Sequence, residues 1–287
     1  MGSVTLLSAS QVGTFQQCSL KWAFRYVHRA PEETRAAALV VGSAVDVAVK
    51  AGIHAIRSGD VSLERLDSEA LFDAAWRSEV VKIDGPPIDW GSNKDEAHHR
   101  EIALGVTRAF LDAPDLGERI DRIEALDVRF ELPMFDPTTG LEVQDLTVMG
   151  ILDAVERTPA GVRPLDFKTA SSKAGYDESS LATHLQGSLY VDALQRLHPE
   201  DASDEMAFWI GMKLKQPVTE DRVVTISPSA RRRALLTVLH AHRAMELGVA
   251  FPQPSFLCAG CPYRLRCQTW QEEAEAPTPL DAFAVGV

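Results

Sequence analysis

Gly150-Ile151-Leu152-Asp153, followed thirteen residues later by Asp166-Phe167-Lys168, is the stretch of sequence that decides the fold. Asp153 ends an apolar run, residues 162–169 read as the next strand, and Thr158-Pro159-Ala160-Gly161 forms the turn between them. A hairpin places its two strands side by side, and residues two apart on a strand point to the same face. We therefore expect the Asp153 and Asp166 carboxylates to meet the Lys168 ammonium.

The flanking segments extend this hairpin into a larger sheet with helices around it. Residues 8–28 and 35–57 have apolar residues at helical spacing, and Ser8 with Gln11 fits a capping box at the start of the first helix. The order of the elements is typical of an α/β fold with a mixed sheet flanked by helices. The expected strands are residues 125–132, 146–156, 162–169, 207–214 and 223–226, and the expected later helices are residues 179–198 and 230–247.

The chain divides by composition into one large domain and a tail. Residues 1–250 carry the periodic segments, and within them residues 58–120 are polar and helical, with a turn-rich break at residues 84–87. Nothing in residues 58–120 indicates chemistry, so we expect a helical insertion there. Residues 251–287 are rich in proline and cysteine and lack periodicity, which predicts a C-terminal tail.

Composition places the chain among ordinary globular proteins. Of its 287 residues 45% are hydrophobic and 24% are charged, which is enough to bury a core. The net charge of −12 argues against a protein that coats nucleic acid, although arginine clusters such as residues 231–233 could line a local basic channel. No apolar run approaches the roughly 20 residues of a membrane span, and the N-terminus lacks a secretory pattern. We therefore expect a cytoplasmic protein with no membrane partner.

Two carboxylates and a lysine at one end of a hairpin are suited to the hydrolysis of a phosphodiester bond. Mg²⁺ and Mn²⁺ prefer carboxylate oxygens, and such an ion polarises a phosphate and lowers the pKa of a bound water. Lys168 could orient the nucleophile or neutralise charge in the transition state. A lone D-x-K pattern is more often a surface feature, but the strand-turn-strand context and the preceding G-x-x-D favour the catalytic interpretation.

Two further pairs share helix faces. Gln186 and Tyr190 are four residues apart on the helix after the hairpin, as are Gly42 and Asp46 on an earlier helix. Gln186 could hold a metal-bound water or a phosphate, and Tyr190 could stack on, or hydrogen-bond to, the strand being cut. Taken alone, the two residues fit better a partly buried pair that packs at the edge of the sheet.

The four cysteines are unevenly placed. Cys258, Cys261 and Cys267 lie within ten residues, and Cys18 lies 240 residues before the first of them. Cys18 falls within the apolar stripe of the first helix and should face inward. A disulfide framework would need an export signal and usually a denser set of cysteines. A structural zinc and free buried thiols stay open, although four-cysteine zinc sites usually pair two short C-x2–4-C motifs.

Together these motifs occur in the order known from one group of enzymes. The chain resembles the PD-(D/E)XK nucleases, and within them the RecB-like exonucleases with an iron–sulfur cluster. That group includes the nuclease domains of RecB and AddB, CRISPR adaptation nucleases and phage exonucleases. The resemblance covers most of the chain outside residues 58–120. It rests on residues 7–18, 42–46, 150–153 and 165–169, on Gln186 with Tyr190, and on the C-x2-C-x5-C pattern of residues 258–267.

The resemblance implies a role for each active-site residue. Asp153 and Asp166 would bind a divalent metal, Mg²⁺ or Mn²⁺, and Lys168 would be the catalytic lysine. Gln186 and Tyr190 match the Q-x-x-x-Y helix that accompanies these residues in the family.

Two cofactor assignments also follow from the resemblance. Cys18, Cys258, Cys261 and Cys267 match the ligands of a [4Fe–4S] cluster, which is favoured over zinc. The family usually has a histidine ligand at the position of Asp46. An aspartate still offers an oxygen to a hard cation, so we expect Asp46 to join Asp153 and Asp166 as a metal ligand.

The expected function is that of a divalent-metal-dependent deoxyribonuclease, an exonuclease acting on single strands or duplex ends in recombination, repair or phage DNA metabolism. Its partners would be DNA and recombination or CRISPR adaptation proteins. One alternative is a CRISPR spacer-adaptation nuclease, against which the long insertion argues. The other is a catalytically degenerate DNA-binding or scaffold module, against which the retained Asp153, Asp166 and Lys168 argue.

Overall fold

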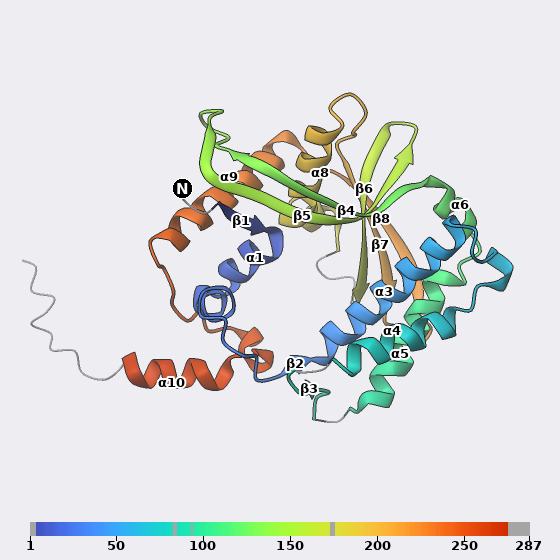
Figure 1. Ribbon diagram of the computed structural model, residues 1–287, viewed down its shortest axis with the longest axis horizontal. Coiled ribbons are helices and arrows are strands. Elements are labelled where there is room, and N and C mark those ends of the chain that lie inside the picture. Colours follow the sequence, from blue (N-terminus) through green and yellow to red (C-terminus); the bar gives the residue numbers. More distant parts are fainter. Residues whose placement is uncertain (1–3, 83–84, 93, 173–175, 275–287) are drawn as a thin grey trace, which may run out of the picture.

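The computed structural model describes residues 4–82, 85–92, 94–172 and 176–274, and a six-stranded mixed sheet lies at its centre (Figure 1). The strand order is β1-β5-β6-β7-β8, with β4 paired to β5. Helices cover both faces, which confirms the predicted α/β fold with a mixed sheet flanked by helices. The strands are β1 Thr5–Ser8, β4 Ile123–Phe135, β5 Glu142–Thr158, β6 Gly161–Ala170, β7 Glu205–Met212 and β8 Val218–Thr225.

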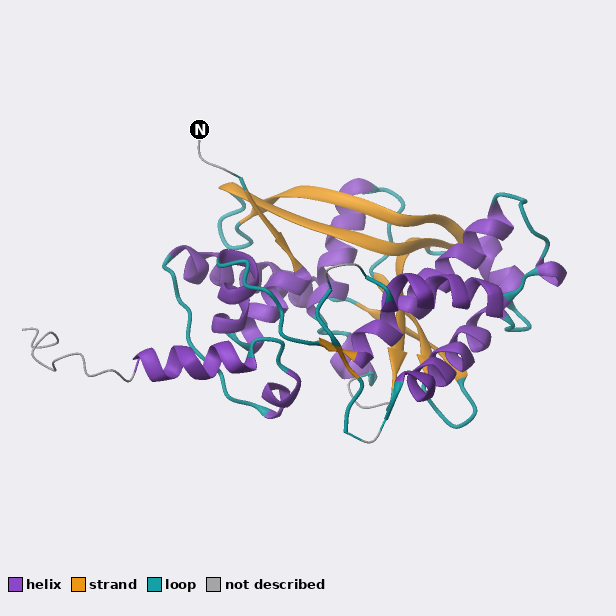
Figure 2. Ribbon diagram, turned by 60° about the horizontal axis from the view of Figure 1, so that its bottom comes forward, coloured by secondary structure: helices purple, strands orange, loops and turns teal. Residues whose placement is uncertain are grey.

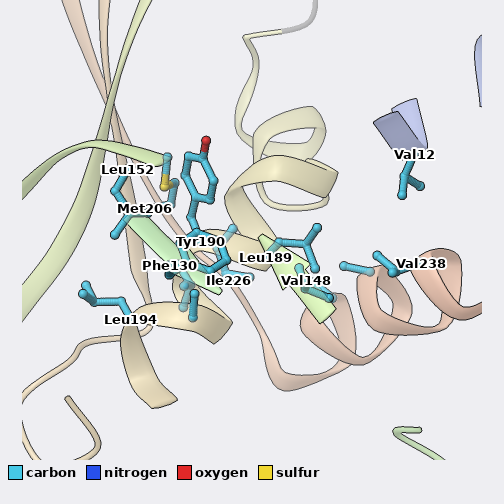
Figure 3. Packing of buried hydrophobic residues seen from close by; sticks show 14 of the residues in the cluster. Val12, Phe130, Val148, Leu152, Leu189, Tyr190, Leu194, Met206, Ile226 and Val238 are labelled. Carbon is cyan, nitrogen blue, oxygen red and sulfur yellow. The ribbon is translucent and has the colours of Figure 1, made fainter. Parts of the chain in front are cut away.

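Two hydrophobic cores separate the sheet from its helices. On one face, α1 (Ala9–Gln17), α8 (Leu185–Leu197) and α9 (Pro228–Glu246) enclose a cluster that includes Val12, Leu189 and Val238, as Figure 3 shows. The opposite face is covered by helices of the N-terminal half of the chain. These are α3 Ala37–Arg57, α4 Ser68–Val80 and α5 Glu96–Leu111, followed by α6 Leu116–Arg122.

The predicted meander is present, and β5 is its longest strand. β4, β5 and β6 pair antiparallel in succession, and β6 then pairs parallel with β7 after a crossover through α7 (Glu178–Leu181) and α8. Where one helix was expected over residues 179–198 there are two, because the chain breaks before His184, whose side chain caps α8. The edge of β5 opposite β4 is shared by two strands, with β1 along residues 146–149 and β6 along residues 154–158.

The first predicted helix differs from the structure in its continuity. The capping box of Ser8 and Gln11 is present, as expected, but the helix is not continuous over residues 8–28. It stops at Cys18, whose backbone is extended and whose sulfur accepts a hydrogen bond from the amide of Lys21. A short helix, α2 (Ser19–Trp22), and a π-helical turn, η1 (Ala23–Val27), follow. The break places the Cys18 sulfur at the start of a new helix.

Residues 58–120, expected as an insertion, contribute to the second core. Phe110 on α5 packs edge-on against Trp209 of β7, with 4.7 Å between ring centroids, and Phe72 and Trp76 on α4 are buried in the same cluster. This stretch therefore supports one face of the sheet. It also contains η2 Leu63–Arg65 and β3 Ile88–Asp89, which pairs with β2 Arg35–Ala36.

Helix α3 is long and apolar enough, by length and composition, to cross a membrane. Its apolar side is buried against α4, α5 and β6, and Val40, Val45 and Ile53 are within 2% of complete burial. The position of α3 in the protein core accounts for its composition.

The C-terminal tail folds back onto the N-terminal helices. It contains a 3-10 helix, η3 (Phe256–Gly260), and α10 (Arg264–Ala274), which is the outlying helix at the lower left of Figures 1 and 2. Tyr263 is buried against Leu20 and Phe24, and the backbone of Phe251 exchanges hydrogen bonds with the Ser19 hydroxyl at 3.0 and 3.1 Å. The remainder of the predicted tail, residues 275–287, lies outside the described residues.

Candidate active site

The site lies where two strands of the sheet separate. The last paired residues of β5 and β6 are Ala154 and Leu165, so Asp153 and Asp166 stand at the point of divergence. Beyond it, the amide of Phe167 donates a hydrogen bond of 3.0 Å to Asp153 Oδ2 instead of to the backbone of β5. The Gly150–Asp153 stretch occupies the gap along this edge between the parts of β5 that pair with β1 and with β6. Strand divergence thus brings two carboxylates to one point.

On one side of this point, Lys168 and α8 surround Asp166. Lys168 Nζ lies 2.6 Å from Asp166 Oδ2, and Gln186 joins the pair by accepting from Lys168 at 3.2 Å and donating to Asp166 Oδ1 at 3.3 Å. Gln186 also donates to the Tyr190 hydroxyl at 2.8 Å. Tyr190 has its ring in the apolar cluster, with its hydroxyl directed away from it (Figure 3). Gln186 therefore fixes Lys168, Asp166 and Tyr190 relative to one another.

On the other side, an ammonium from α3 binds the second carboxylate. Lys50 Nζ lies 2.8 Å from Asp153 Oδ1, 3.0 Å from Asp46 Oδ2 and 2.9 Å from Asp127 Oδ1. Asp46 and Lys50 are one helical turn apart on α3, and Asp127 comes from β4. Neither Lys50 nor Asp127 was predicted as a site residue, whereas the structure places every predicted active-site residue around this point.

The site carries an excess of negative charge. Four carboxylates (Asp46, Asp127, Asp153 and Asp166) face two ammonium groups (Lys50 and Lys168), which leaves a formal charge of −2. A single divalent cation would neutralise this charge. The chemistry of the donor set, all carboxylate oxygen, also fits a hard ion such as Mg²⁺ or Mn²⁺.

Burial and the closeness of the carboxylates raise the pKa values of Asp46 and Asp166. Burial, with the nearby Asp153 carboxylate, raises the pKa of Asp46 to about 6. Burial also raises the pKa of Asp166, which is 1% exposed, and the Asp153 carboxylate adds to this against the opposing effect of Lys168. Mutual repulsion of buried carboxylates favours protonation, and a bound cation would reverse it.

Tyr190 and the lysines keep their protons. Burial raises the pKa of Tyr190 to about 12, so its hydroxyl can donate a hydrogen bond at neutral pH. Burial alone would lower the pKa of Lys50, but the carboxylates of Asp153 and Asp46 outweigh it and raise that pKa. The Asp166 carboxylate likewise raises the pKa of Lys168 against the effect of burial. Both ammonium groups are therefore positive charges.

A hollow of about 430 Å³ opens beside these groups, lined by Gly42 and Asp46 of α3 and by Phe167 and Lys168 of β6. Within the part of the chain that the structure describes, no three His, Cys, Asp or Glu side chains converge closely enough to hold a metal ion. In the active site, Lys50 lies between the carboxylates of Asp46 and Asp153.

Gly150 leaves room for the rings of Phe130 and Tyr190. A Cβ at this position would lie 2.6 Å from two ring carbons of Phe130 and 3.2 Å from the Tyr190 ring. We expect Gly150→Ala to lower the free energy of unfolding by about 1–3 kcal/mol, because overpacking forces aromatic rings out of place. Urea denaturation would measure the change. Gly13→Ala on α1 is the control, since no atom lies within 4 Å of its Cβ position; an equal loss in both variants would contradict the account.

The four cysteines gather at a second place. They line one cavity of about 240 Å³ together with Leu20 and Phe24. Burial raises the pKa of both Cys261 and Cys267, and the neighbouring sulfurs contribute in the same direction. The amide of Ser255 donates to the Cys258 sulfur, as the amide of Lys21 does to that of Cys18. The structure thus brings together cysteines from both ends of the chain.

Comparison with known proteins identifies the family of the chain. Residues 6–268 match the model of the PD-(D/E)XK nuclease superfamily, and the chain belongs to that superfamily. It is therefore a member of a nuclease family whose substrate is DNA and whose members generally use Mg²⁺ or Mn²⁺. No protein of curated function matches the sequence.

Two solved structures are similar to the chain at low identity. One is a "Putative exonuclease" from Eubacterium rectale, with 13% identity and a TM-score of 0.48, covering 98% of this chain and 94% of the other. The second is SSO0001, with 11% identity and a TM-score of 0.37, covering 87% of this chain and 94% of the other.

Proposed function

We propose that the protein is a divalent-metal-dependent DNA exonuclease whose active site is formed by Asp153, Asp166 and Lys168. The observation that carries this proposal is the meeting of these three residues where β5 and β6 separate. Their position in a nuclease superfamily supports the catalytic interpretation over a structural ion pair.

Asp153, Asp166 and Asp46 are the residues that would hold Mg²⁺ or Mn²⁺. Such an ion, when bound, would polarise the scissile phosphate and lower the pKa of a water. Lys168 is placed by Asp166 and Gln186 so that its ammonium can face the phosphate and stabilise developing charge. The Tyr190 hydroxyl, which accepts from Gln186, keeps its own proton available for the DNA strand.

The substrate would be the end of a DNA strand, single or in a duplex. The hollow between α3 and β6 is lined by Asp46 and Lys168, so DNA bound there would lie beside the proposed metal ligands. The resemblance to RecB-like exonucleases is the basis for restricting cleavage to DNA ends. It also suggests a role in recombination, repair or phage DNA metabolism. The protein partners would then be recombination or CRISPR adaptation proteins.

A comparison of linear and covalently closed DNA tests the exonuclease assignment. With Mg²⁺ or Mn²⁺, end-labelled linear DNA should lose its label as mononucleotides or short oligonucleotides, while closed single-stranded and double-stranded circles stay intact. Cleavage of circles at the rate of linear DNA would show an endonuclease and contradict the proposal.

Asp46 should act as a metal ligand in place of the family's usual histidine. We expect Asp46→Ala to weaken Mg²⁺ binding roughly tenfold or more, because it removes an oxygen donor from the site. Asp46→His should shift the preference from Mg²⁺ towards Mn²⁺, since imidazole suits softer ions. Calorimetric titration with both ions measures this, with Asp121→Ala on the surface of α6 as control. Unchanged Mg²⁺ affinity in Asp46→Ala would show that Asp46 is not a metal ligand.

The four cysteines would hold a [4Fe–4S] cluster that joins the ends of the chain. Thiolates of four cysteines are the ordinary ligands of such a cluster. A zinc ion needs its four sulfurs about 2.3 Å away. The four sulfurs line one cavity of about 240 Å³. The resemblance to RecB-like exonucleases favours a cluster over zinc, and one distant cysteine with a C-x2-C-x5-C pattern fits the paired motifs of zinc sites less well.

A further inference from the structure

The proposed chemistry does not explain the contacts that the Lys50 ammonium makes. An ammonium has three N–H donors, and three carboxylates surround this one. They come from three separate elements: Asp46 from α3, Asp127 from β4 and Asp153 from β5, all within 3.0 Å. The Lys50 side chain is only 14% exposed, so its ammonium is largely shielded from solvent.

The ammonium occupies space that a divalent ion would need. Asp153 Oδ2 already accepts from the Phe167 amide, and Asp153 Oδ1 is bound to Lys50. Asp46 and Asp153 would hold Mg²⁺ through their carboxylate oxygens, and Mg²⁺ needs such oxygens at about 2.0–2.1 Å. Lys50 Nζ already lies 2.8 and 3.0 Å from oxygens of these two residues, so both cations cannot bind them in the same way.

We propose that Lys50 is an internal competitor of the divalent ion: it holds the metal-free site together, and it must release Asp153 before the ion binds. The proposal rests on the metal-dependent function and adds a residue to it. Without a cation between them, Asp46 and Asp153 would repel each other. A tethered ammonium prevents this and keeps the carboxylates in place for the ion that replaces it.

Asp127 is the carboxylate with which the Lys50 ammonium can stay paired after it releases Asp153. Its backbone has a φ of 50°, in the left-handed region that non-glycine residues seldom adopt within a strand. The Asp127 carboxylate is 57% exposed, and its Oδ1 lies 2.9 Å from Lys50 Nζ. Lys50 can therefore leave Asp153, keep Asp127 as its partner and lie closer to solvent.

Calorimetric titration with Mg²⁺, and with Ca²⁺ as a second probe, tests the competition. Lys50→Met keeps the length of the side chain and removes the charge, and it should bind both ions about tenfold more tightly than the unaltered protein, because no cation has to be displaced. The matched control is Lys82→Met, which removes an ammonium paired with Glu79 outside the site and should leave affinity unchanged. Equal or weaker binding in Lys50→Met overturns the proposal.

A second measurement needs no variant and so does not depend on the folding of Lys50→Met. Acetylation of the unaltered protein, read at each lysine by mass spectrometry, should label Lys50 faster when Ca²⁺ is added and Lys82 at the same rate. Unchanged labelling of Lys50 at saturating Ca²⁺ would show that the ammonium stays where it is. If neither the unaltered protein nor Lys50→Met binds either ion, the metal-dependent function fails as well. If the unaltered protein binds and Lys50→Met binds no tighter, only the role of Lys50 fails.

Discussion

Asp166→Asn and Lys168→Met should each lower the rate of DNA hydrolysis by at least about 100-fold. The first removes a proposed metal ligand, and the second removes the ammonium that we propose stabilises charge on the phosphate. Both residues belong to one contact network with Gln186, so loss of either also releases the other from its position. Initial rates on end-labelled DNA at saturating Mg²⁺ measure the effect.

Folding has to be checked in these variants, because removing one partner of a buried ion pair can destabilise a protein by about 3–5 kcal/mol. Asn keeps the shape of Asp166, and Met keeps the length of Lys168. Circular dichroism should show the same fold for both variants. Lys82→Met and Asp121→Ala, which alter charges outside the site, should cleave at the parental rate. If Asp166→Asn or Lys168→Met also cleaves at that rate, the active site has been placed wrongly.

The second large effect is expected at the cysteines. Protein purified without oxygen should be brown, with broad absorbance near roughly 400 nm, and Cys18→Ser should be colourless. Cys18→Ser should also lower the free energy of unfolding by about 3 kcal/mol or more. The proposed cluster would close a very long loop between the first helix and the tail, and ligand binding that requires the folded state adds to stability.

Chemical analysis of iron, sulfide and zinc distinguishes the two cofactors. Gln268→Ala changes an exposed neighbour of Cys267 and keeps all four sulfurs, so it should retain both colour and stability. If the unaltered protein is colourless and contains one zinc per chain, the four cysteines bind a structural zinc and not a cluster. Protein with neither metal, and equal stability in Cys18→Ser, would leave four free thiols.

The parts of the fold that local pattern decides could be predicted from sequence. Alternation along β4 and helical periodicity along α3 and α9 arise from burial of one face of each element, which leaves a direct trace in the order of residues. The Ser8 and Gln11 capping box is equally local. Tertiary pairing leaves no such trace: the parallel contact of β1 with β5 joins segments about 140 residues apart and was not predicted.

The break at Cys18 illustrates a second limit. Periodicity continues across residues 8–28, but the sulfur of Cys18 caps the next helix and the tail packs against it, so tertiary contacts interrupt the pattern. The polar look of residues 58–120 was misleading in a similar way, because a few large side chains such as Phe72, Trp76 and Phe110 carry the contact with the rest of the core.

The residues of the proposed active site could be found from the sequence because their chemistry and their spacing both match a motif. Lys50 had an available signal, since Gly42, Asp46 and Lys50 follow one another at four-residue intervals on one helix face. Asp127 had none. It lies in the alternating pattern of β4, and its left-handed backbone conformation cannot be read from residue type.

The rate at which chelator-treated protein releases label from end-labelled linear DNA, as Mg²⁺ or Mn²⁺ is added, tests the metal-dependent active site most directly. The account predicts no release in EDTA and a saturable rise in rate with either ion. Release in EDTA at the full rate, or no cleavage of single-stranded or double-stranded DNA by folded protein at any concentration of either ion, would contradict it.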